Sequence, residues 1–271
     1  MASVMVSVAG RVASVTLSNP GKLNAMSRLM WRELRAAFEG FAANSALRCV
    51  VITGGGNSAC EGEGKGESNG GHFSAGGDIS EYAAFRFSEA SLQEFHEDDV
   101  WGALQAMLDC DLPIIARIAG NCMGAGLEIA SCCDIRLASS HARFGAPIAK
   151  LGFPMAPREA ALVIGAVGEL TAREMLLAAS VFDSSQMLQR GFLNQVCSAA
   201  ELGRTVQGYV DRISQLAPQA AALNKQSFRA LSQSIRAQAA PQLIATAYRY
   251  AESSEHREGV TAFIEKRPPR F

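Results

Sequence analysis

Apolar residues at every second position open the chain and predict a pair of strands. Valines alternate in this way through residues 4–8, and the alternation resumes with Val15 and Leu17 after a turn that contains Gly10. A period of two residues is typical of a strand, and one face of the pair is then expected to be buried. The first 18 residues are therefore predicted to form a strand, a tight turn and a second strand.

Three short apolar runs predict further strands of a buried sheet. They read RCVVIT at residues 48–53, PIIARIA at 113–119 and DIRLA at 134–138. Continuous apolar runs that are rich in β-branched residues are typical of parallel strands, because such strands are covered on both faces. We therefore expect all three to lie inside the protein.

A period of 3.6 residues predicts helices between these strands and after them. Ser27 is a candidate N-cap for a helix that runs to Phe41, and further helices are expected over residues 88–108 and 125–132. From Ala156 onward the pattern is mostly helical, most clearly in TAREMLLAA, ELGRTVQGYVDRISQLA and LIATAYRYAE. Strands that alternate with helices, followed by a helical tail, indicate an α/β fold with a C-terminal helical region.

One low-complexity stretch interrupts this pattern at residues 54–71. It is dense in Gly, Glu, Ser and Asn and cannot bury enough apolar surface to order itself, so it is expected to be a surface loop. No internal repeat and no linker divides the rest of the chain. We therefore expect a core over residues 1–199, which carries this insertion, and a C-terminal helical region over residues 200–271.

The composition excludes several classes of protein. The 271 residues include 25 Lys and Arg against 26 Asp and Glu, which gives a formal net charge of −1 at pH 7, and 48% are hydrophobic. Such a chain is expected to bury a sizeable core, and it lacks the charge excess that would attract nucleic acid or an anionic membrane. No apolar stretch approaches the roughly 20 residues that span a bilayer, and the N-terminus shows no export signal, so a cytoplasmic protein is expected.

The cysteines and histidines show no pattern that is typical of disulfides or metal sites. The seven cysteines form no CxxC pair, and most lie in apolar runs, so we expect reduced, buried thiols. The four histidines show no spacing that is typical of zinc ligands. The sequence therefore predicts no metal site.

Two glycine-containing turns carry the candidate chemistry. The first spans residues 73–79 (FSAGGDI), in which Asp78 is expected to cap the segment that follows. The second spans residues 120–128 (GNCMGAGLE), where a buried strand ends and a helix begins. Glu128 lies three residues after Ala125, so its carboxylate is expected on the same face as an unpaired N–H of the first helical turn. A carboxylate beside such a donor suits proton removal next to a carbonyl, although a glutamate at this place can also simply complement the helix dipole.

These residues resemble a known family. The run PIIARIAGNCMGAGLEIASCCDIRLASSHARFGAP looks like the signature of the crotonase (enoyl-CoA hydratase/isomerase) superfamily. Four further segments resemble other landmarks of this superfamily and occur in the same order: NPGKLNAM, HFSAGGDI, RGFLNQV and REGVTAFIEKRPPRF. The resemblance covers nearly the whole chain.

The resemblance implies a fold, an assembly and a substrate class. The fold is a spiral of ββα turns with a C-terminal helical trimerisation region, assembled as a homotrimer or a hexamer. Members bind acyl-CoA thioesters and stabilise an enolate-like intermediate with two backbone N–H groups, which fall here on Gly77 and Ala125. Glu128 matches a catalytic acid/base. No cofactor is implied, because coenzyme A is part of the substrate.

The resemblance also implies the substrate-binding residues. Residues 77–80 would border the CoA and its pantetheine, residues 23–25 would approach the adenine, and the C-terminal pair Phe263 and Lys266 would touch the CoA of a neighbouring subunit. A solvated charge at a helix end is an equally good interpretation of Lys266. The full expected set is Leu23, Asn24, Ala25, Ala75, Gly77, Asp78, Ile79, Ser80, Ala125, Ile148, Phe263 and Lys266.

One position departs from the family pattern. Hydratases of the family use two glutamates, and where relatives read FGxPE this chain reads FGAPI, so Ile148 replaces the second glutamate. Ile148 cannot transfer a proton. The nearest later acid is Glu159, for which we expect a place in the first turn of a surface helix, although substitution for the missing acid is the alternative.

Three functions stay open on the sequence. The first is an enoyl-CoA hydratase or double-bond isomerase in which Glu128 is the sole acid/base, and isomerisation tolerates Ile148 better than hydration does. The second is another enolate reaction on the same scaffold, such as decarboxylation or thioester hydrolysis. The third is an acyl-CoA-binding protein with little catalysis, against which the buried carboxylate at Glu128 argues.

Overall fold

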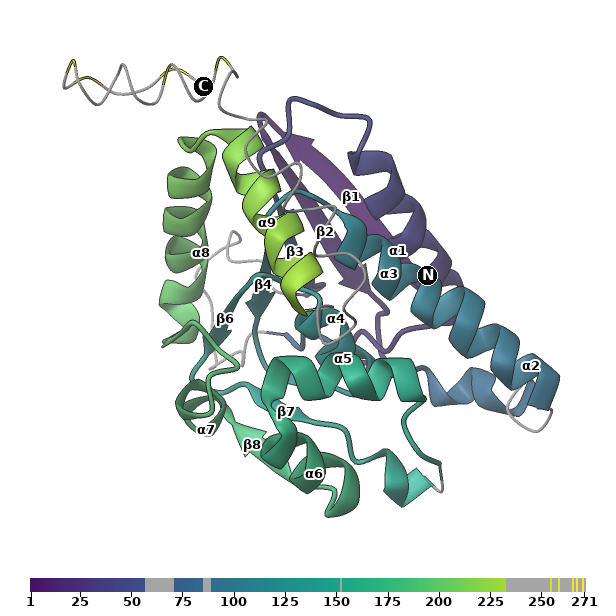
Figure 1. Cartoon of the computed structure of the whole chain (residues 1–271). Helices are drawn as coiled ribbons and strands as arrows, with labels where there is room; N and C mark the ends of the chain where they lie inside the picture. The colour runs from purple at the N-terminus through teal and green to yellow at the C-terminus, as the bar shows by residue number, and fades with distance from the viewer. Residues whose placement is uncertain are drawn as a thin grey trace.

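The computed structural model describes residues 1–56, 71–84, 89–151 and 153–232, together with the single residues 254, 258, 265, 267 and 270. Within these ranges the strands form two sheets (Figure 1). The larger sheet has the order β1-β2-β3-β4-β6-β9, and the smaller has the order β5-β7-β8. The strands are β1 (Ser3–Ala9), β2 (Val12–Ser18), β3 (Cys49–Gly54), β4 (Ile114–Ile118), β5 (Asn121–Met123), β6 (Ile135–Ser139), β7 (Arg143–Gly145), β8 (Val181–Asp183) and β9 (Gln195–Cys197).

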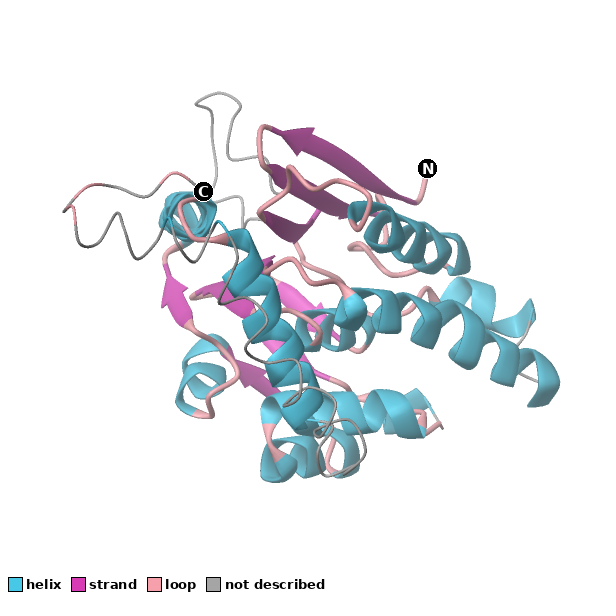
Figure 2. Cartoon of the chain, turned by 45° about the horizontal axis from the view of Figure 1, so that its top comes forward, coloured by secondary structure: helices cyan, strands magenta, loops and turns pink. Residues whose placement is uncertain are grey.

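Helices connect these strands and cover the larger sheet (Figure 2). Every pairing of that sheet is parallel except β1 with β2, which form an antiparallel hairpin. Strands that alternate with helices confirm the expected α/β class. The helices are α1 (Arg28–Phe41), α2 (Glu89–Glu94), α3 (Trp101–Asp109), α4 (Ala125–Ser131), α5 (Pro157–Val167), α6 (Glu169–Leu177), α7 (Ser184–Gln189), α8 (Ala199–Ser214) and α9 (Pro218–Ser232), with 3-10 turns η1 (Ile79–Ala84) and η3 (Ile148–Leu151) and a π-helix η2 (Phe95–Val100).

The parallel strands are buried on both faces, as their continuous apolar runs predicted. Alternate residues of β3 point to opposite sides, so Val50 packs into the main core with α1 and α3, whereas Cys49 packs against α8. The buried residues of α8 recur every three or four positions, from Leu202 to Ile213, and form one stripe on the sheet. The helix α8 therefore belongs to the packed core.

The N-terminal hairpin differs from the expectation of one buried face. Alternate residues of β2 are fully buried, but β1 is an edge strand whose Met5, Val6 and Val8 are each about half exposed. An edge strand has a neighbour on one side only, and α1 covers only the first residues of β1. The pattern of valines therefore identified the strand correctly but not its burial.

Two helical predictions are confirmed, and one of them needs a correction in detail. The Ser27 hydroxyl accepts a hydrogen bond from the Met30 N–H at 3.2 Å and caps α1. The region 88–108 is helical where described, but its middle is the π-helix η2, which the 3.6-residue period did not reveal. The insertion lies outside the described residues at positions 57–70, as does LIATAYRYAE at 243–252.

The cysteines in the described ranges are free thiols. Five of these six are buried, while Cys197 is partly exposed, and Cys60 lies outside the described residues. Burial raises the pKa of the Cys49 thiol to about 11 and that of Cys133 to about 12. These thiols therefore behave as small apolar residues near neutral pH. None of the described helices is both long and apolar enough to cross a membrane.

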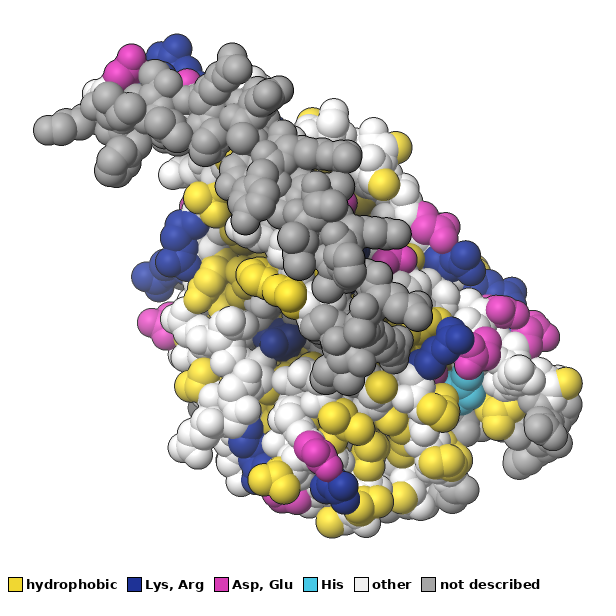
Figure 3. Space-filling model, viewed as in Figure 1, with side chains coloured by type: hydrophobic (Ala, Val, Ile, Leu, Met, Phe, Trp, Pro, Cys, Tyr) yellow, Lys and Arg dark blue, Asp and Glu magenta, His cyan; other side chains and the backbone are white. Residues whose placement is uncertain are grey.

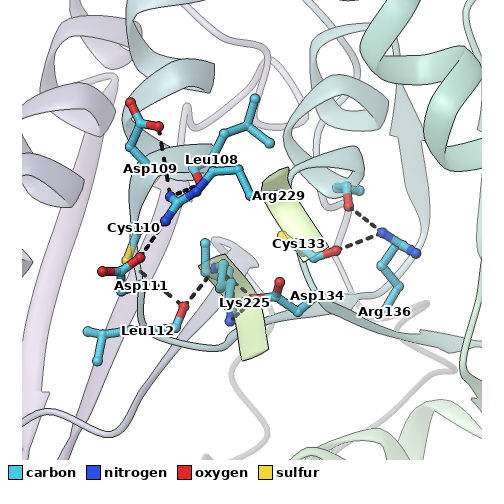
Figure 4. A network of polar contacts seen from close by, with 12 residues as sticks. Leu108, Asp109, Cys110, Asp111, Leu112, Cys133, Asp134, Arg136, Lys225 and Arg229 are labelled. Carbon is cyan, nitrogen blue, oxygen red and sulfur yellow. Dashed lines mark hydrogen bonds and ion pairs between the residues drawn. The ribbon is translucent and has the colours of Figure 1, made fainter. Parts of the chain in front are cut away.

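The helix α9, which ends the described range 153–232, is fixed to the core by charged side chains (Figure 4). Lys225 Nζ contacts the Leu112 carbonyl oxygen and Asp134 Oδ2, each at 2.8 Å. The guanidinium of Arg229 binds the Leu108 carbonyl oxygen at 2.7 Å and the Asp111 carboxylate at 2.5 Å. We call these six residues the α9 anchor, which joins the helical region to the segments that precede β4 and β6.

Candidate active site

A cavity of about 330 Å³ lies where the first turns of α4 and α5 meet the loop before η1 and the π-helix η2. Its walls are mostly apolar, and the titratable side chains that line it are Tyr82, His96, Glu128 and Glu159. The lining residues are Trp31, Ala75, Gly76, Gly77, Ile79, Tyr82, Phe95, His96, Val100, Met123, Gly124, Ala125, Glu128, Pro147, Ile148, Leu151, Phe153, Pro154, Met155 and Glu159.

The α4 wall is built by the strand, glycine turn and helix that the sequence predicted. Strand β5 ends at Met123, and Gly124 then turns the chain with a φ of +46°, which L-residues rarely adopt. A Cβ on Gly126 would lie 2.9 Å from the Ser74 Cβ, so glycine also permits close packing against the neighbouring loop. These two glycines aim the N-terminus of α4 at the cavity.

Two backbone N–H groups face this cavity without a hydrogen-bonding partner among the described residues. They belong to Gly77 and Ala125. Three of the neighbouring N–H groups are engaged: Gly76 donates to Ser74 Oγ, Asp78 to the Met26 carbonyl oxygen, and Gly124 to the Gly145 carbonyl oxygen. Unengaged donors in an apolar cavity are suited to an oxygen on which negative charge develops.

The loop that presents Gly77 is held by Asp78. Its carboxylate accepts hydrogen bonds from Lys22 at 2.7 Å, from the hydroxyl and backbone N–H of Ser80, and from Asn19. Burial alone would raise the pKa of Asp78, but these hydrogen bonds outweigh it and hold the pKa below its usual value. The bond to the Ser80 N–H confirms that Asp78 caps the segment after it.

Glu128 lies in the first turn of α4 and lines the same cavity. Only 8% of its surface is exposed, and every residue of this helix is buried. The helix places the Glu128 carboxylate one turn after the Ala125 N–H. One wall of the cavity thus combines a buried carboxylate with an unengaged donor.

The opposite wall contains a second carboxylate. Glu159 comes from the first turn of α5, is 3% exposed, and lies 2.8 Å through Oε1 from Nδ1 of His96 on the π-helix. Glu159 does lie in the first turn of a helix with an exposed face, as expected, but its own side chain is buried instead of solvated. The reason is tertiary, because α5 packs on α4 and its first turn faces the cavity.

The residues predicted to bind substrate divide into three groups. Those that line the cavity are Ala75, Gly77, Ile79, Ala125 and Ile148. Those that lie beside it without lining it are Leu23, Asn24, Ala25, Asp78 and Ser80, of which Leu23 accepts a hydrogen bond from the Ala75 N–H at 3.0 Å. Phe263 and Lys266 lie outside the described residues.

Sequence analysis missed the wall formed by the helical region after residue 88. Phe95, His96 and Val100 line the cavity from the π-helix, and Phe153 and Glu159 line it from the segment that leads into α5. The helical period of the sequence gave no sign of this wall, although π-helices such as η2 concentrate at functional sites. Nothing in the spacing of Glu159 indicated that it points inward.

Comparison with known proteins agrees with this geometry. The sequence model of the family "Enoyl-CoA hydratase/isomerase" matches residues 8–271 of the chain. The chain belongs to the enoyl-CoA hydratase/isomerase family. This result confirms the resemblance to the crotonase superfamily, of which this family is part.

Relatives of this family are similar along their whole length. A 2,3-dehydroadipyl-CoA hydratase from Escherichia coli is 30% identical over 275 residues, covering 100% of this chain and 99% of the relative. A short-chain-enoyl-CoA hydratase from Clostridium acetobutylicum is 29% identical, with 98% and 95% of the two chains covered. A crystal structure described as an enoyl-CoA hydratase/carnithine racemase from Magnetospirillum magneticum superposes with a TM-score of 0.90 at 30% identity, covering 99% of this chain and 94% of the other. The fold is therefore the crotonase fold.

Proposed function

We propose that this member of the enoyl-CoA hydratase/isomerase family converts an enoyl-CoA thioester through an enolate, with Glu128 as acid/base. The observation that carries the proposal is the convergence of the Glu128 carboxylate and the unengaged N–H groups of Gly77 and Ala125 on one cavity. The two donors would hold the thioester oxygen as it becomes negatively charged. Glu128 would move the proton at the neighbouring carbon.

A single carboxylate can carry out isomerisation. Glu128 takes a proton from C2 of a 3-enoyl-CoA, and the electron pair of that C–H bond delocalises through the thioester to its oxygen. The protonated Glu128 then returns the proton to C4, and the double bond now joins C2 and C3. One carboxylate is sufficient for this cycle, because the group that removes the proton also gives it back.

The cavity favours an apolar acyl group. Trp31, Tyr82, Phe95, Val100 and Phe153 form much of its wall, and no lysine or arginine is among its described lining residues. A charged acyl end would lose its hydration there without gaining a countercharge. Coenzyme A enters as part of the substrate, and no other cofactor is part of the proposal.

The proposed assembly is a homotrimer or hexamer in the cytoplasm. Apolar side chains gather on the face formed by α5 and α6 (Figure 3). Leu170 and Leu177 of α6 are each 78% exposed, and Ile164 of α5 is 41% exposed. Exposed apolar patches of this kind mark protein interfaces, which supports an assembly through this face.

The test is the Glu128→Gln variant, assayed with crotonyl-CoA and with a 3-enoyl-CoA. We expect turnover of either substrate to fall by about 10³-fold or more, because the amide cannot carry the proton, while acyl-CoA binding by calorimetry persists. Glu169→Gln is the matched control, since Glu169 also lies in a first helical turn but is exposed. Equal activity in Glu128→Gln and in the unmodified protein would overturn the proposal.

A further inference from the structure

The proposed function uses one carboxylate only, because Ile148 occupies the position of the second glutamate in the family pattern. We propose that Glu159 supplies this second carboxylate from α5, with His96 as its positioning residue, and that the chain is a hydratase with two carboxylates. This inference rests on the proposed function and extends it from enolate chemistry in general to the addition of water.

The placement of Glu159 is the first support. Its side chain is almost completely buried, yet it lines the same cavity as Glu128, which enters from α4. One oxygen, Oε1, is bound to His96 at 2.8 Å, and the other, Oε2, makes no hydrogen bond to any residue that the structure describes. An ionised carboxylate only accepts hydrogen bonds, so Nδ1 of His96 is the donor and Oε2 is left for a water molecule.

The choice of partner is the second support. A buried carboxylate held only for stability would be expected to pair with a full positive charge. Arg158 is the next residue along the chain, but its guanidinium pairs with the exposed Glu97 at 3.1 Å and lies over the Trp101 ring. The partner of Glu159 among the described residues is instead the imidazole of His96.

The support of His96 is the third observation. His96 lies on the π-helix, which is held to α1 by Asp99. The Asp99 carboxylate is buried and pairs with Arg28 and Arg32 at 2.6 Å each. The ring of Phe95 packs edge-on against His96, with 5.1 Å between centroids. His96 thus lies on a helix that is tied to α1, and its ring packs against Phe95, which suits a positioning residue.

The two carboxylates allow hydration to balance. Water, held by Glu159 Oε2, bonds through its oxygen to C3 of a 2-enoyl-CoA, and Glu159 takes the proton released. The C2–C3 π electrons move toward the thioester oxygen, which the N–H groups of Gly77 and Ala125 hold. Protonated Glu128 then gives its proton to C2. The two carboxylates have exchanged protonation states, and a second water molecule that carries the proton from Glu159 to Glu128 restores them.

The experiment compares hydration of crotonyl-CoA with isomerisation of 3-hexenoyl-CoA in the full chain. Glu159→Gln is expected to lower hydration by about 10²-fold or more and isomerisation by less than 10-fold, because only hydration needs the second carboxylate. Glu97→Gln is the matched control, since Glu97 is a nearby but exposed acid, and it is expected to change neither rate. A Glu159→Gln protein that folds and hydrates at the original rate would overturn the inference.

Three further variants separate catalysis from folding. Ile148→Glu, added to Glu159→Gln, is expected to restore hydration at least 10-fold, because it returns a carboxylate to the family position. Glu159→Asp keeps the charge but retracts it by one methylene, and it is expected to lower kcat for hydration while the melting temperature stays within a few degrees. His96→Gln is expected to lower kcat for hydration with little change in KM, whereas a loss of stability alone would move neither constant at low temperature.

The unmodified protein distinguishes the two proposals. Isomerisation without measurable hydration overturns the role of Glu159 and leaves the role of Glu128 intact. Inactivity toward both substrates overturns the proposed function itself. Hydration that is lost in both Glu128→Gln and Glu159→Gln, with isomerisation lost only in Glu128→Gln, supports both.

Discussion

The α9 anchor and the cavity hold charged side chains in different ways. In the α9 anchor each carboxylate meets a full positive charge, as Lys225 meets Asp134 and Arg229 meets Asp111. In the cavity two carboxylates, Glu128 and Glu159, share the lining with one imidazole and with no lysine or arginine of the described residues.

The difference is the one expected if the anchor charges hold the fold and the cavity carboxylates act in the proposed reaction. A buried ion pair recovers its lost hydration through its own geometry and through extra hydrogen bonds, as Lys225 does with the Leu112 carbonyl oxygen. Glu159 has the imidazole of His96 as its partner among the described residues, instead of a lysine or arginine. Variants in the two regions should therefore affect different measurements.

Among the variants that test this contrast, the largest effect is expected from Ala125→Pro in the cavity. Ala125 is the first residue of α4, where proline fits because the N–H has no helical partner. The substitution removes one of the two unengaged donors, and kcat/KM is expected to fall about 10²- to 10³-fold. Circular dichroism and urea unfolding would show a nearly unchanged fold, and an unchanged kcat/KM would exclude this N–H from the reaction.

A smaller effect, on stability instead of activity, is expected from Lys225→Met in the α9 anchor. The variant leaves Asp134 and the Leu112 carbonyl oxygen without their cation, so the free energy of unfolding is expected to fall by about 2 kcal/mol, since Asp134 is partly exposed. The kcat should not change. Arg173→Met, which breaks an exposed ion pair with Glu169, is the control and is expected to change stability little. Urea titration measures both, and a Lys225→Met protein as stable as this control would contradict the contrast between regions.

The smallest effect concerns Asp78, a buried carboxylate of the paired kind that lies next to the cavity. Its pKa is lower folded than unfolded, so its contribution to stability is present above its unfolded pKa of about 3.9 and is lost as the pH falls through its folded pKa. Asp78→Asn is therefore expected to be less stable than the unmodified protein at pH 6. Between pH 5 and pH 2 the stability of the variant is expected to fall less than that of the unmodified protein, because the variant lacks this titrating carboxyl. If thermal unfolding gave the same dependence of stability on pH for both proteins, Asp78 would not be the source of that dependence.

The parts of the fold that could be predicted are those that short-range chemistry specifies. The Ser27 cap fixes the start of α1, and the glycines at 124 and 126 fix the turn into α4, so sequence patterns located both. The glycine turn therefore identifies Glu128 from the sequence alone. Three-residue strands such as β5, β7 and β8 were not predicted, because they are too short to show a period and depend on one another for pairing.

The second wall of the cavity could not be predicted because its residues meet only in the folded protein. Glu159 and His96 are 63 positions apart, and the direction of each depends on how its helix packs. A glutamate in a first helical turn is usually solvated, and that general tendency gave the wrong prediction here. Only the position of α5 against α4 turns the Glu159 side chain inward.

The π-helix η2 has a consequence for how this enzyme could change. Such a segment amounts to one extra residue inside a continuous helix, and an α-helix turns by about 100° per residue. Deleting a single codon within residues 95–100 would restore an ordinary α-helix from α2 to α3 and rotate Phe95 and His96 away from the cavity. On the proposed mechanism, such a deletion after His96 would withdraw the support of Glu159 and abolish hydration, while Glu128 would still isomerise, so variants with different reactions would lie one deletion apart.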